Sequence, residues 1–290
     1  MIPEGNRDAE ARRRNLMLRV ASSAVLIPAV LVAAYLGGWV FFVLCALAAL
    51  GIFWEWSRLT DSAEARVLAS AGIAFAATLA LTGLGHVAAA AVAVVIGAIV
   101  AGGVAASRNG AVGRSGLVHG MWAAGGVIYA GAAFFGPALL RRDAEFGFAA
   151  FLFLALTVWA TDTCAFALGR AIGGPLLWPR VSPNKTWSGA IGGLAGGVAG
   201  GTLVAYADGL GRLAVIGVIA LVLSALAQAG DFLESAIKRH FGAKDTSQLI
   251  PGHGGLMDRL DGFLVAAVAA LLIGIARQGT TAAAHGLLVW

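Results

Sequence analysis

The sequence predicts an all-α, polytopic integral membrane protein with about nine transmembrane helices. Of its 290 residues, 59% are hydrophobic and 12% are charged, whereas soluble domains carry about 25% charged residues. The apolar residues occur in runs that reach or approach the about 20 residues a helix needs to cross a bilayer. The strict alternation of apolar and polar residues that a transmembrane β-barrel requires is absent from the sequence. Lipid is therefore the expected solvent for most of the chain.

Nine apolar segments support this prediction, and we expect each to form one helix. Their approximate limits are 16–36, 39–54, 67–84, 86–105, 117–139, 147–169, 187–206, 213–230 and 260–276. The predicted organisation is a polar cytoplasmic tail (1–15), an N-terminal membrane scaffold where dimer contacts could lie (16–146), a catalytic membrane region (147–276) and a short C-terminal tail (277–290). Long cytoplasmic loops are expected at 170–186 and 231–258, and no segment resembles a strand.

The basic residues predict the orientation. With the N-terminus in the cytoplasm, 16 of the 20 Lys and Arg residues fall on the cytoplasmic side and 4 on the other. This bias sets the orientation of membrane proteins, so we expect a cytoplasmic N-terminus in the cell (inner) membrane. The net charge of +5 is explained by this sorting and by phosphate binding, and no basic patch interleaved with aromatic residues indicates nucleic-acid binding.

Glycines are frequent, and those from Gly189 to Gly201 recur at a spacing of four residues. Small residues at this spacing let helix backbones approach closely in lipid. Packing within one protomer and a dimer interface are both compatible with the pattern.

A polar cluster follows the eighth segment. Asp231, Glu234, Ser235 and Lys238 are spaced i, i+3, i+4 and i+7, so a helix would place them on one face, and Arg239 comes next. A soluble amphipathic helix can show this spacing by chance. Ionisable groups at the end of a membrane span are costly, however, which favours a functional role.

The residues before and at the start of the ninth segment form a second cluster. Lys244-Asp245 is followed by Pro251–Gly255, a Gly-rich stretch whose backbone amides could face a phosphate, although an ordinary loop is also compatible. Asp258 and Asp261 then share one helical face. Adjacent carboxylates repel unless a cation neutralises them, and Mg²⁺ favours carboxylates combined with substrate phosphates. A magnesium site is therefore predicted here.

A third cluster, Ser182–Thr186, precedes the seventh segment. Pro183 prevents a helix at this point, and Lys185 together with the N-terminus of the following span favours anions. A helix cap followed by an interfacial Trp is an alternative interpretation.

Single acidic residues within the apolar segments are interpreted individually. Asp162 lies inside the sixth segment, where an unpaired carboxylate is expensive, so it is a candidate site residue. A structural, hydrogen-bonded aspartate is the alternative. Glu55 and Arg58 follow the second segment and are interpreted as interfacial charges.

At these residues the sequence resembles the phosphatidate cytidylyltransferase family, also called CDP-diacylglycerol synthases. The family signature is Ser-x-apolar-Lys-Arg, four residues, Lys-Asp, and a His-Gly-Gly-apolar-x-Asp-Arg-apolar-Asp ending, and residues 235–261 match every defined position. Two further family patterns are similar to Trp159–Phe166 and Ser182–Gly189. Ser188 stands where the family usually has Glu, which puts a need for that carboxylate in doubt.

The resemblance implies that CTP and phosphatidic acid give CDP-diacylglycerol and pyrophosphate, in a Mg²⁺-dependent helical dimer. The charge bias predicts that the site faces the cytoplasm. It implies Asp231 and Asp258 as metal ligands, and we add Asp261 as a ligand or a supporting residue. A second cation is left open. The predicted catalytic residues are Asp231, Lys238, Arg239, Asp258 and Asp261. The predicted substrate-binding residues are Asp162, Ser182, Asn184, Lys185, Thr186, Glu234, Ser235, Lys244, Asp245, His253, Gly254, Gly255 and Arg259.

The residues fit this reaction, because the lipid phosphate is already a nucleophile and the site need only neutralise charge and align the reactants. Among rival classes, CDP-alcohol phosphatidyltransferases also have an Asp-x-x-Asp-Gly start, but 263–276 lacks the further charges of their motif. A CTP-dependent polyprenol kinase has the same requirements and stays open. A cation transporter would place acidic residues near the membrane midplane in both halves of the chain. Here Asp162, Asp231 and Asp258 all lie in the C-terminal half.

Overall fold

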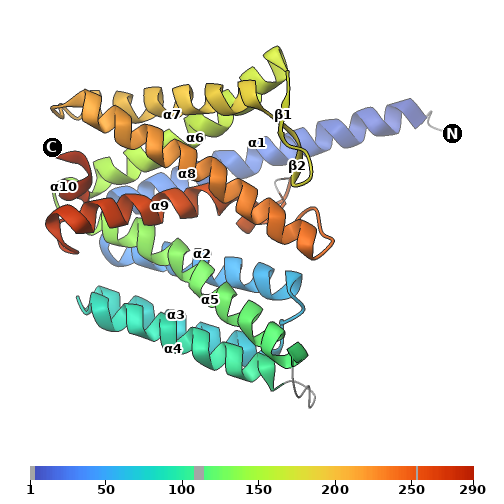
Figure 1. Cartoon of the computed structure of the whole chain (residues 1–290), viewed down its shortest axis with the longest axis vertical. Helices are drawn as coiled ribbons and strands as arrows, with labels where there is room; N and C mark the ends of the chain where they lie inside the picture. The colour runs from blue at the N-terminus through green and yellow to red at the C-terminus, as the bar shows by residue number, and fades with distance from the viewer. Residues whose placement is uncertain (1–3, 108–113, 253) are drawn as a thin grey trace.

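The computed structural model describes residues 4–107, 114–252 and 254–290. Within these residues nine helices are long and apolar enough to cross a membrane, which confirms the predicted all-α polytopic fold. The helices are α1 (Glu4–Leu36), α2 (Gly38–Leu59), α3 (Ala65–Gly83), α4 (Val87–Ala106), α5 (Arg114–Arg141), α6 (Gly147–Ile172), α7 (Trp187–Ala207), α8 (Leu213–His240) and α9 (Met257–Gln278), followed by the short α10 (Ala283–Leu288). Figure 1 shows the long helices side by side, with the N- and C-termini at opposite ends of the bundle.

The ends of several elements differ from the prediction; α2 runs on to Leu59, so Glu55 and Arg58 lie inside it and not after it. The helix α1 begins at Glu4, so most of the polar segment predicted as a tail continues the first helix. The helix α8 runs on to His240 and α9 begins at Met257, which shortens the predicted loop 231–258 to 241–256. Hydropathy identifies the part of a helix that faces lipid, but it does not identify the residue at which the helical hydrogen bonds end. The hydropathy limit of the eighth segment therefore left the polar last turns of α8 in the predicted loop.

The segment 170–186 also differs, because it contains a small β-hairpin. The strands β1 (Leu176–Trp178) and β2 (Ser182–Thr186) pair antiparallel, with Leu176 opposite Thr186 and Trp178 opposite Ser182. Pro183 lies at an edge of this two-stranded sheet, where a missing amide is tolerated. The expectation that no segment forms a strand is therefore wrong for this hairpin, which Figure 1 shows at the N-terminal end of α7.

The glycine-rich face of α7 packs inside the protomer. A Cβ atom at Gly189 would come 2.8 Å from the carbonyl oxygen of Ala165, and one at Gly201 would come 2.7 Å from the Thr157 hydroxyl, both on α6. These distances are too short for any larger side chain, so the glycines let α6 and α7 touch along their backbones. Of the two interpretations of this pattern, packing within one protomer is the one observed.

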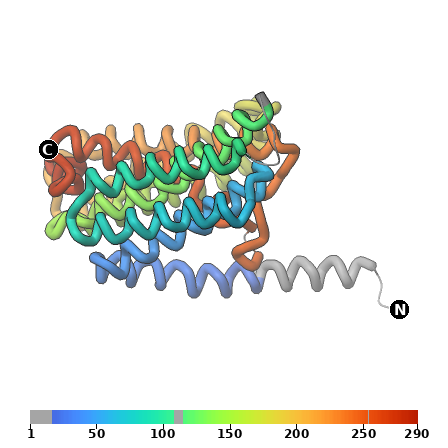
Figure 2. Tube along the Cα trace, turned by 90° about the horizontal axis from the view of Figure 1, so that it is seen from below, coloured from blue at the N-terminus to red at the C-terminus, as the bar shows by residue number. Residues whose placement is uncertain are grey.

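Two groups of buried apolar residues form the core. One joins α2, α3, α4 and α5 with the start of α9, and the other joins α6, α8, α9 and α10. The helix α1 is the least buried span, with 11% of its most apolar window buried. Figure 2 shows it along one side of the bundle. The start of α9 therefore lies where the N-terminal and C-terminal halves of the chain meet.

Candidate active site

The predicted polar face of α8 forms as expected. The ammonium Nζ of Lys238 lies 2.5 Å from Glu234 Oε2, one helical turn away, and the Ser235 hydroxyl lies 3.4 Å from Asp231 Oδ1. Glu234 is fully buried, and neither of its oxygens accepts a hydrogen bond of regular geometry among the described residues. Its ion pair with Lys238 compensates part of the cost of burying the charge.

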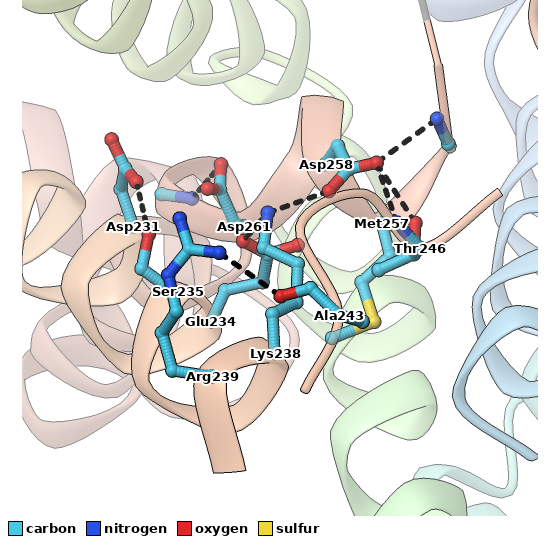
Figure 3. Close-up of polar contacts among 12 residues, drawn as sticks. Asp231, Glu234, Ser235, Lys238, Arg239, Ala243, Thr246, Met257, Asp258 and Asp261 are labelled. Atoms are coloured by element: carbon cyan, nitrogen blue, oxygen red, sulfur yellow. Dashed lines mark hydrogen bonds and ion pairs between the residues drawn. The ribbon is translucent and has the colours of Figure 1, made fainter. Parts of the chain in front are cut away.

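Close packing of α8 and α9 brings their acids together. A Cβ atom at Gly230 would come 2.7 Å from the Asp261 carbonyl oxygen, and one at Gly262 would come 2.7 Å from the Ala227 carbonyl oxygen. Only glycine permits this approach, which places the start of the α8 polar face directly beside Asp261. In the view of Figure 3, Asp261 lies between Asp231 and Asp258.

Asp258 is held from several directions. Its Oδ1 accepts a 2.7 Å hydrogen bond from Lys238 Nζ. Its Oδ2 accepts from the Thr246 amide at 3.1 Å, the Thr246 hydroxyl at 2.9 Å and the Gly255 amide at 3.0 Å. Lys238 therefore bridges Glu234 and Asp258 (Figure 3). This carboxylate ties the end of α8, the loop 241–256 and the start of α9 together.

Asp231 has a simpler environment beside the hairpin. Its Oδ2 forms an ion pair with Lys185 of β2, and both side chains are about one-third exposed, at 35% and 30% respectively. The Lys185 ammonium also lies 4.4 Å from the ring centre of Phe232, which in turn packs against Trp178 of β1 at 6.0 Å. The hairpin is thus fastened to α8 through one ion pair and two contacts with the Phe232 ring.

Asp162 and Arg259 belong to the same electrostatic cluster. Asp162 on α6 interacts electrostatically with Asp231, Lys185 and Arg259. Asp261 interacts with Asp231, Asp162 and Lys238. The structure therefore brings together acids from α6, α8 and α9 that are almost 100 residues apart in the sequence.

This cluster fits a divalent cation by its chemistry. Five carboxylates, from Asp162, Asp231, Glu234, Asp258 and Asp261, face three cationic side chains, from Lys185, Lys238 and Arg259. With all groups ionised the excess charge is negative, and the donors are all oxygens, which suits Mg²⁺. Among the described residues, no three acidic, His or Cys side chains form a ready-made metal cage. Magnesium sites of this kind usually add substrate phosphates to one or two carboxylates.

The rest of the Ser182–Thr186 segment has mainly local contacts. The Thr186 hydroxyl accepts a 3.1 Å hydrogen bond from the Gly189 amide and so caps α7, as the alternative interpretation held. The Ser188 hydroxyl donates to the Gly173 carbonyl oxygen at 2.5 Å. Ser182 pairs with β1, and Asn184 lies exposed on the hairpin. Lys185 is therefore the residue of this segment that reaches the acidic cluster.

The predicted loop residues divide between contacts and exposure. Arg239 donates to the Ala243 carbonyl oxygen at 3.1 Å, which closes the end of α8, and Lys244 and Asp245 lie exposed. The amides of Gly254 and Gly255, predicted to face a phosphate, donate instead to the Ile250 carbonyl oxygen and to Asp258. His253 lies outside the described residues.

Glu55 is the site residue that the sequence analysis missed. It was interpreted as an interfacial charge, but its side chain is fully buried. It accepts hydrogen bonds from Ser247, Leu256 and Met257, which are about 200 residues further along the chain. Because the partners are so distant in sequence, a lone Glu at the end of an apolar segment gave no signal of this role.

Comparison with known proteins shows the family. A model described as the cytidylyltransferase family matches residues 17–275. Phosphatidate cytidylyltransferases of Brucella suis biovar 1 (strain 1330) and Brucella abortus (strain 2308) are each 41% identical to this chain over 90% of it and 93% of their own length. A phosphatidate cytidylyltransferase of Staphylococcus saprophyticus is 42% identical over 39% of this chain and 44% of its own. The chain belongs to the cytidylyltransferase family, which confirms the resemblance found in residues 235–261.

Proposed function

We propose that the chain catalyses the transfer of a cytidylyl group from CTP to phosphatidic acid. An oxygen of the lipid phosphate attacks the α-phosphorus of CTP, the bond to the β-phosphate oxygen breaks, and CDP-diacylglycerol and pyrophosphate are formed. The observation that carries this proposal is the cluster of five carboxylates and three cations, four of whose residues belong to the signature matched over residues 235–261.

The described residues suit the two requirements of this reaction, which are positive charge to bind the anionic reactants and an anionic nucleophile. Lys185 is part-exposed, so it can exchange its contact with Asp231 for a phosphate of CTP. Arg239, Lys244 and Arg259 are exposed at the same end and add positive charge for the anionic reactants. Because the lipid phosphate is already anionic, no side chain has to generate the nucleophile.

We infer that Asp231 and Asp258, with Asp261 beside them, hold Mg²⁺ together with the CTP phosphates. Of these carboxylates Asp231 is the most open to exchange, because its partners are one part-exposed lysine and a long, 3.4 Å hydrogen bond from the Ser235 hydroxyl. Asp258 has hydrogen bonds on both oxygens, so it acts as a ligand only if Lys238 or the loop yields one of them. Bound magnesium would offset the negative charge that develops as pyrophosphate leaves.

The test is a turnover assay on purified protein with CTP labelled at the α-phosphate. With phosphatidic acid as acceptor, we expect label in the lipid product and release of unlabelled pyrophosphate. A polyprenol kinase would instead transfer label only from the γ-phosphate of CTP, to a polyprenol. A cation transporter would transfer neither. Absence of α-phosphate transfer to phosphatidic acid by folded protein would refute the proposed function.

We also propose that the site faces the cytoplasm of the cell membrane and that the protein works as a homodimer. The 16-to-4 charge bias supports the orientation. Single cysteines at Ser107 and Ser182, in a background lacking Cys45 and Cys164, should react with a membrane-impermeant reagent from the cytoplasm. A cysteine at Gly209 should react from outside. Reaction of the Ser182 position only from outside would overturn the orientation.

A further inference from the structure

We propose that Glu55 is a positioning residue for the transfer reaction, which it serves by holding the loop and the first turn of α9 around Asp258. The inference rests on the proposed function only for its kinetic readout. Glu55 lies on α2, in the half of the chain that carries none of the signature, and it touches neither Lys238 nor Asp258 through a hydrogen bond or ion pair found among the described residues.

The carboxylate of Glu55 is saturated by four donors. Its Oε1 accepts from the Ser247 hydroxyl at 2.5 Å and the Leu256 amide at 2.8 Å. Its Oε2 accepts from the Met257 amide at 2.6 Å and the Thr246 hydroxyl at 3.3 Å. A carboxylate offers about four lone-pair sites, so three are filled by Ser247, Leu256 and Met257 and the fourth by the Thr246 hydroxyl when it donates to Glu55. A charge that is fully buried is tolerable only with such compensation.

Two of these donors are amides at the start of α9. The first amides of a helix have no partner within the helix, and the residue that precedes α9, Leu256, supplies no side-chain cap. Glu55 supplies the acceptor from a different helix, and its negative charge favours the N-terminal end of α9. The first turn of α9, which carries Asp258, is therefore oriented by a residue of α2.

A single hydroxyl connects Glu55 to Asp258. The Thr246 Oγ lies 3.3 Å from Glu55 Oε2 and 2.9 Å from Asp258 Oδ2. It has one proton, so it donates mainly to one carboxylate at a time. Its position between them fixes the carboxylate of Glu55 relative to that of Asp258. A Cβ atom at Gly255 would come 2.0 Å from Thr246 Oγ, 2.8 Å from Asp258 Oδ2 and 3.0 Å from Glu55 Oε1. The glycine of the signature is therefore required by the packing of this unit.

The first test replaces Glu55 by Gln, which keeps the length but turns one acceptor into an amide that faces other donors. We expect kcat to fall about 10–100-fold, as for residues that orient a ligand at one remove, with the KM for CTP changed less than about threefold. Hydrogen exchange of the full-length protein should quicken in the amides of 246–258. The matched controls are Glu145→Gln and Gln248→Ala, both exposed, which should change neither measurement.

A second variant separates positioning from plain stability. Thr246→Val removes the connecting hydroxyl with little change of shape, so kcat should fall as in Glu55→Gln even if thermal stability changes little. A kcat within about twofold of wild type in folded Glu55→Gln protein, or unchanged exchange in 246–258, would overturn the proposal. If Glu55→Gln does not fold, a normal kcat for Thr246→Val overturns it.

If wild-type protein shows no transfer, the proposed function fails, while hydrogen exchange still decides whether Glu55 holds the loop.

Discussion

The two sides of the candidate site are built in opposite ways. The hairpin side, made of Lys185, Asp231 and Phe232, has one ion pair and leaves both charged groups about one-third exposed. The loop side consists of Glu55, Lys238, Thr246, Asp258 and the backbone around them. There, Asp258 and Glu55 each accept three hydrogen bonds from donors of their own, and they share the Thr246 hydroxyl as a fourth donor.

This difference indicates a division of labour. Part-exposed ion pairs contribute about 0–1 kcal/mol, so the contacts of the hairpin side can be exchanged for substrate contacts at little cost. Removing one partner from a buried, hydrogen-bonded charge costs about 3–5 kcal/mol, so the loop side keeps its geometry. On the proposed function, we therefore expect substrate and metal to exchange contacts on the hairpin side, and the loop side to position Asp258.

The largest effect is expected on the hairpin side, from Asp231→Asn. The change keeps the shape but removes the charge that we propose for metal binding. Turnover should fall about 10³-fold or more, because charge stabilisation in the transition state is lost. Stability should fall by less than about 1 kcal/mol, because the lost ion pair is part-exposed. Cytidylyl transfer at limiting Mg²⁺ and thermal unfolding in detergent measure the two effects. A nearly normal rate would remove Asp231 from the site.

On the loop side, Asp258→Asn should reduce both activity and stability. The amide cannot accept all the bonds that Asp258 now accepts, and it leaves Lys238 with Glu234 alone. We expect transfer to fall about 10²-fold and the free energy of unfolding to drop by about 2–4 kcal/mol. A stability loss no larger than that of Asp231→Asn would remove the distinction between the two sides.

The smallest effects on turnover should come from the lysines, and those of Lys185 and Lys238 should differ in kind. Lys185→Ala should raise the KM for CTP about tenfold with a smaller change in kcat, because the exposed lysine contributes mainly to binding. Lys238→Ala should lower kcat about 10–100-fold, because it releases Asp258 from its place. Steady-state kinetics over a range of CTP concentrations separates the two. The same kinetic pattern for both variants would contradict the separate roles.

Local sequence patterns predicted much of the fold and one half of the site. Hydrophobic runs marked the membrane spans, because the length of an apolar run can be read from consecutive residues without knowledge of distant contacts. The i, i+3, i+4 and i+7 spacing placed the polar face of α8 correctly. The resemblance implied Asp231 and Asp258 as metal ligands, which stays a prediction, and the family itself was confirmed by the comparisons.

Features that depend on distant partners could not be predicted this way. The role of Glu55 depends on donors 191 to 202 residues away. The meeting of Asp162 with Asp231 depends on the packing of α6 and α8 in three dimensions. The hairpin was missed because its strands are short and carry no alternating pattern, and the continuation of α8 was missed because its last turns are polar.

The central claim is that the hairpin side receives the metal nucleotide, and metal binding tests it most directly. Mn²⁺ can replace Mg²⁺ and be followed by electron paramagnetic resonance, with CTP present and no lipid acceptor. Wild-type protein and the exposed-loop control Gln248→Ala should bind Mn²⁺ with equal affinity, and Asp231→Asn should bind it at least about tenfold more weakly. Equal Mn²⁺ affinity for Asp231→Asn and wild type in the presence of CTP would contradict the account.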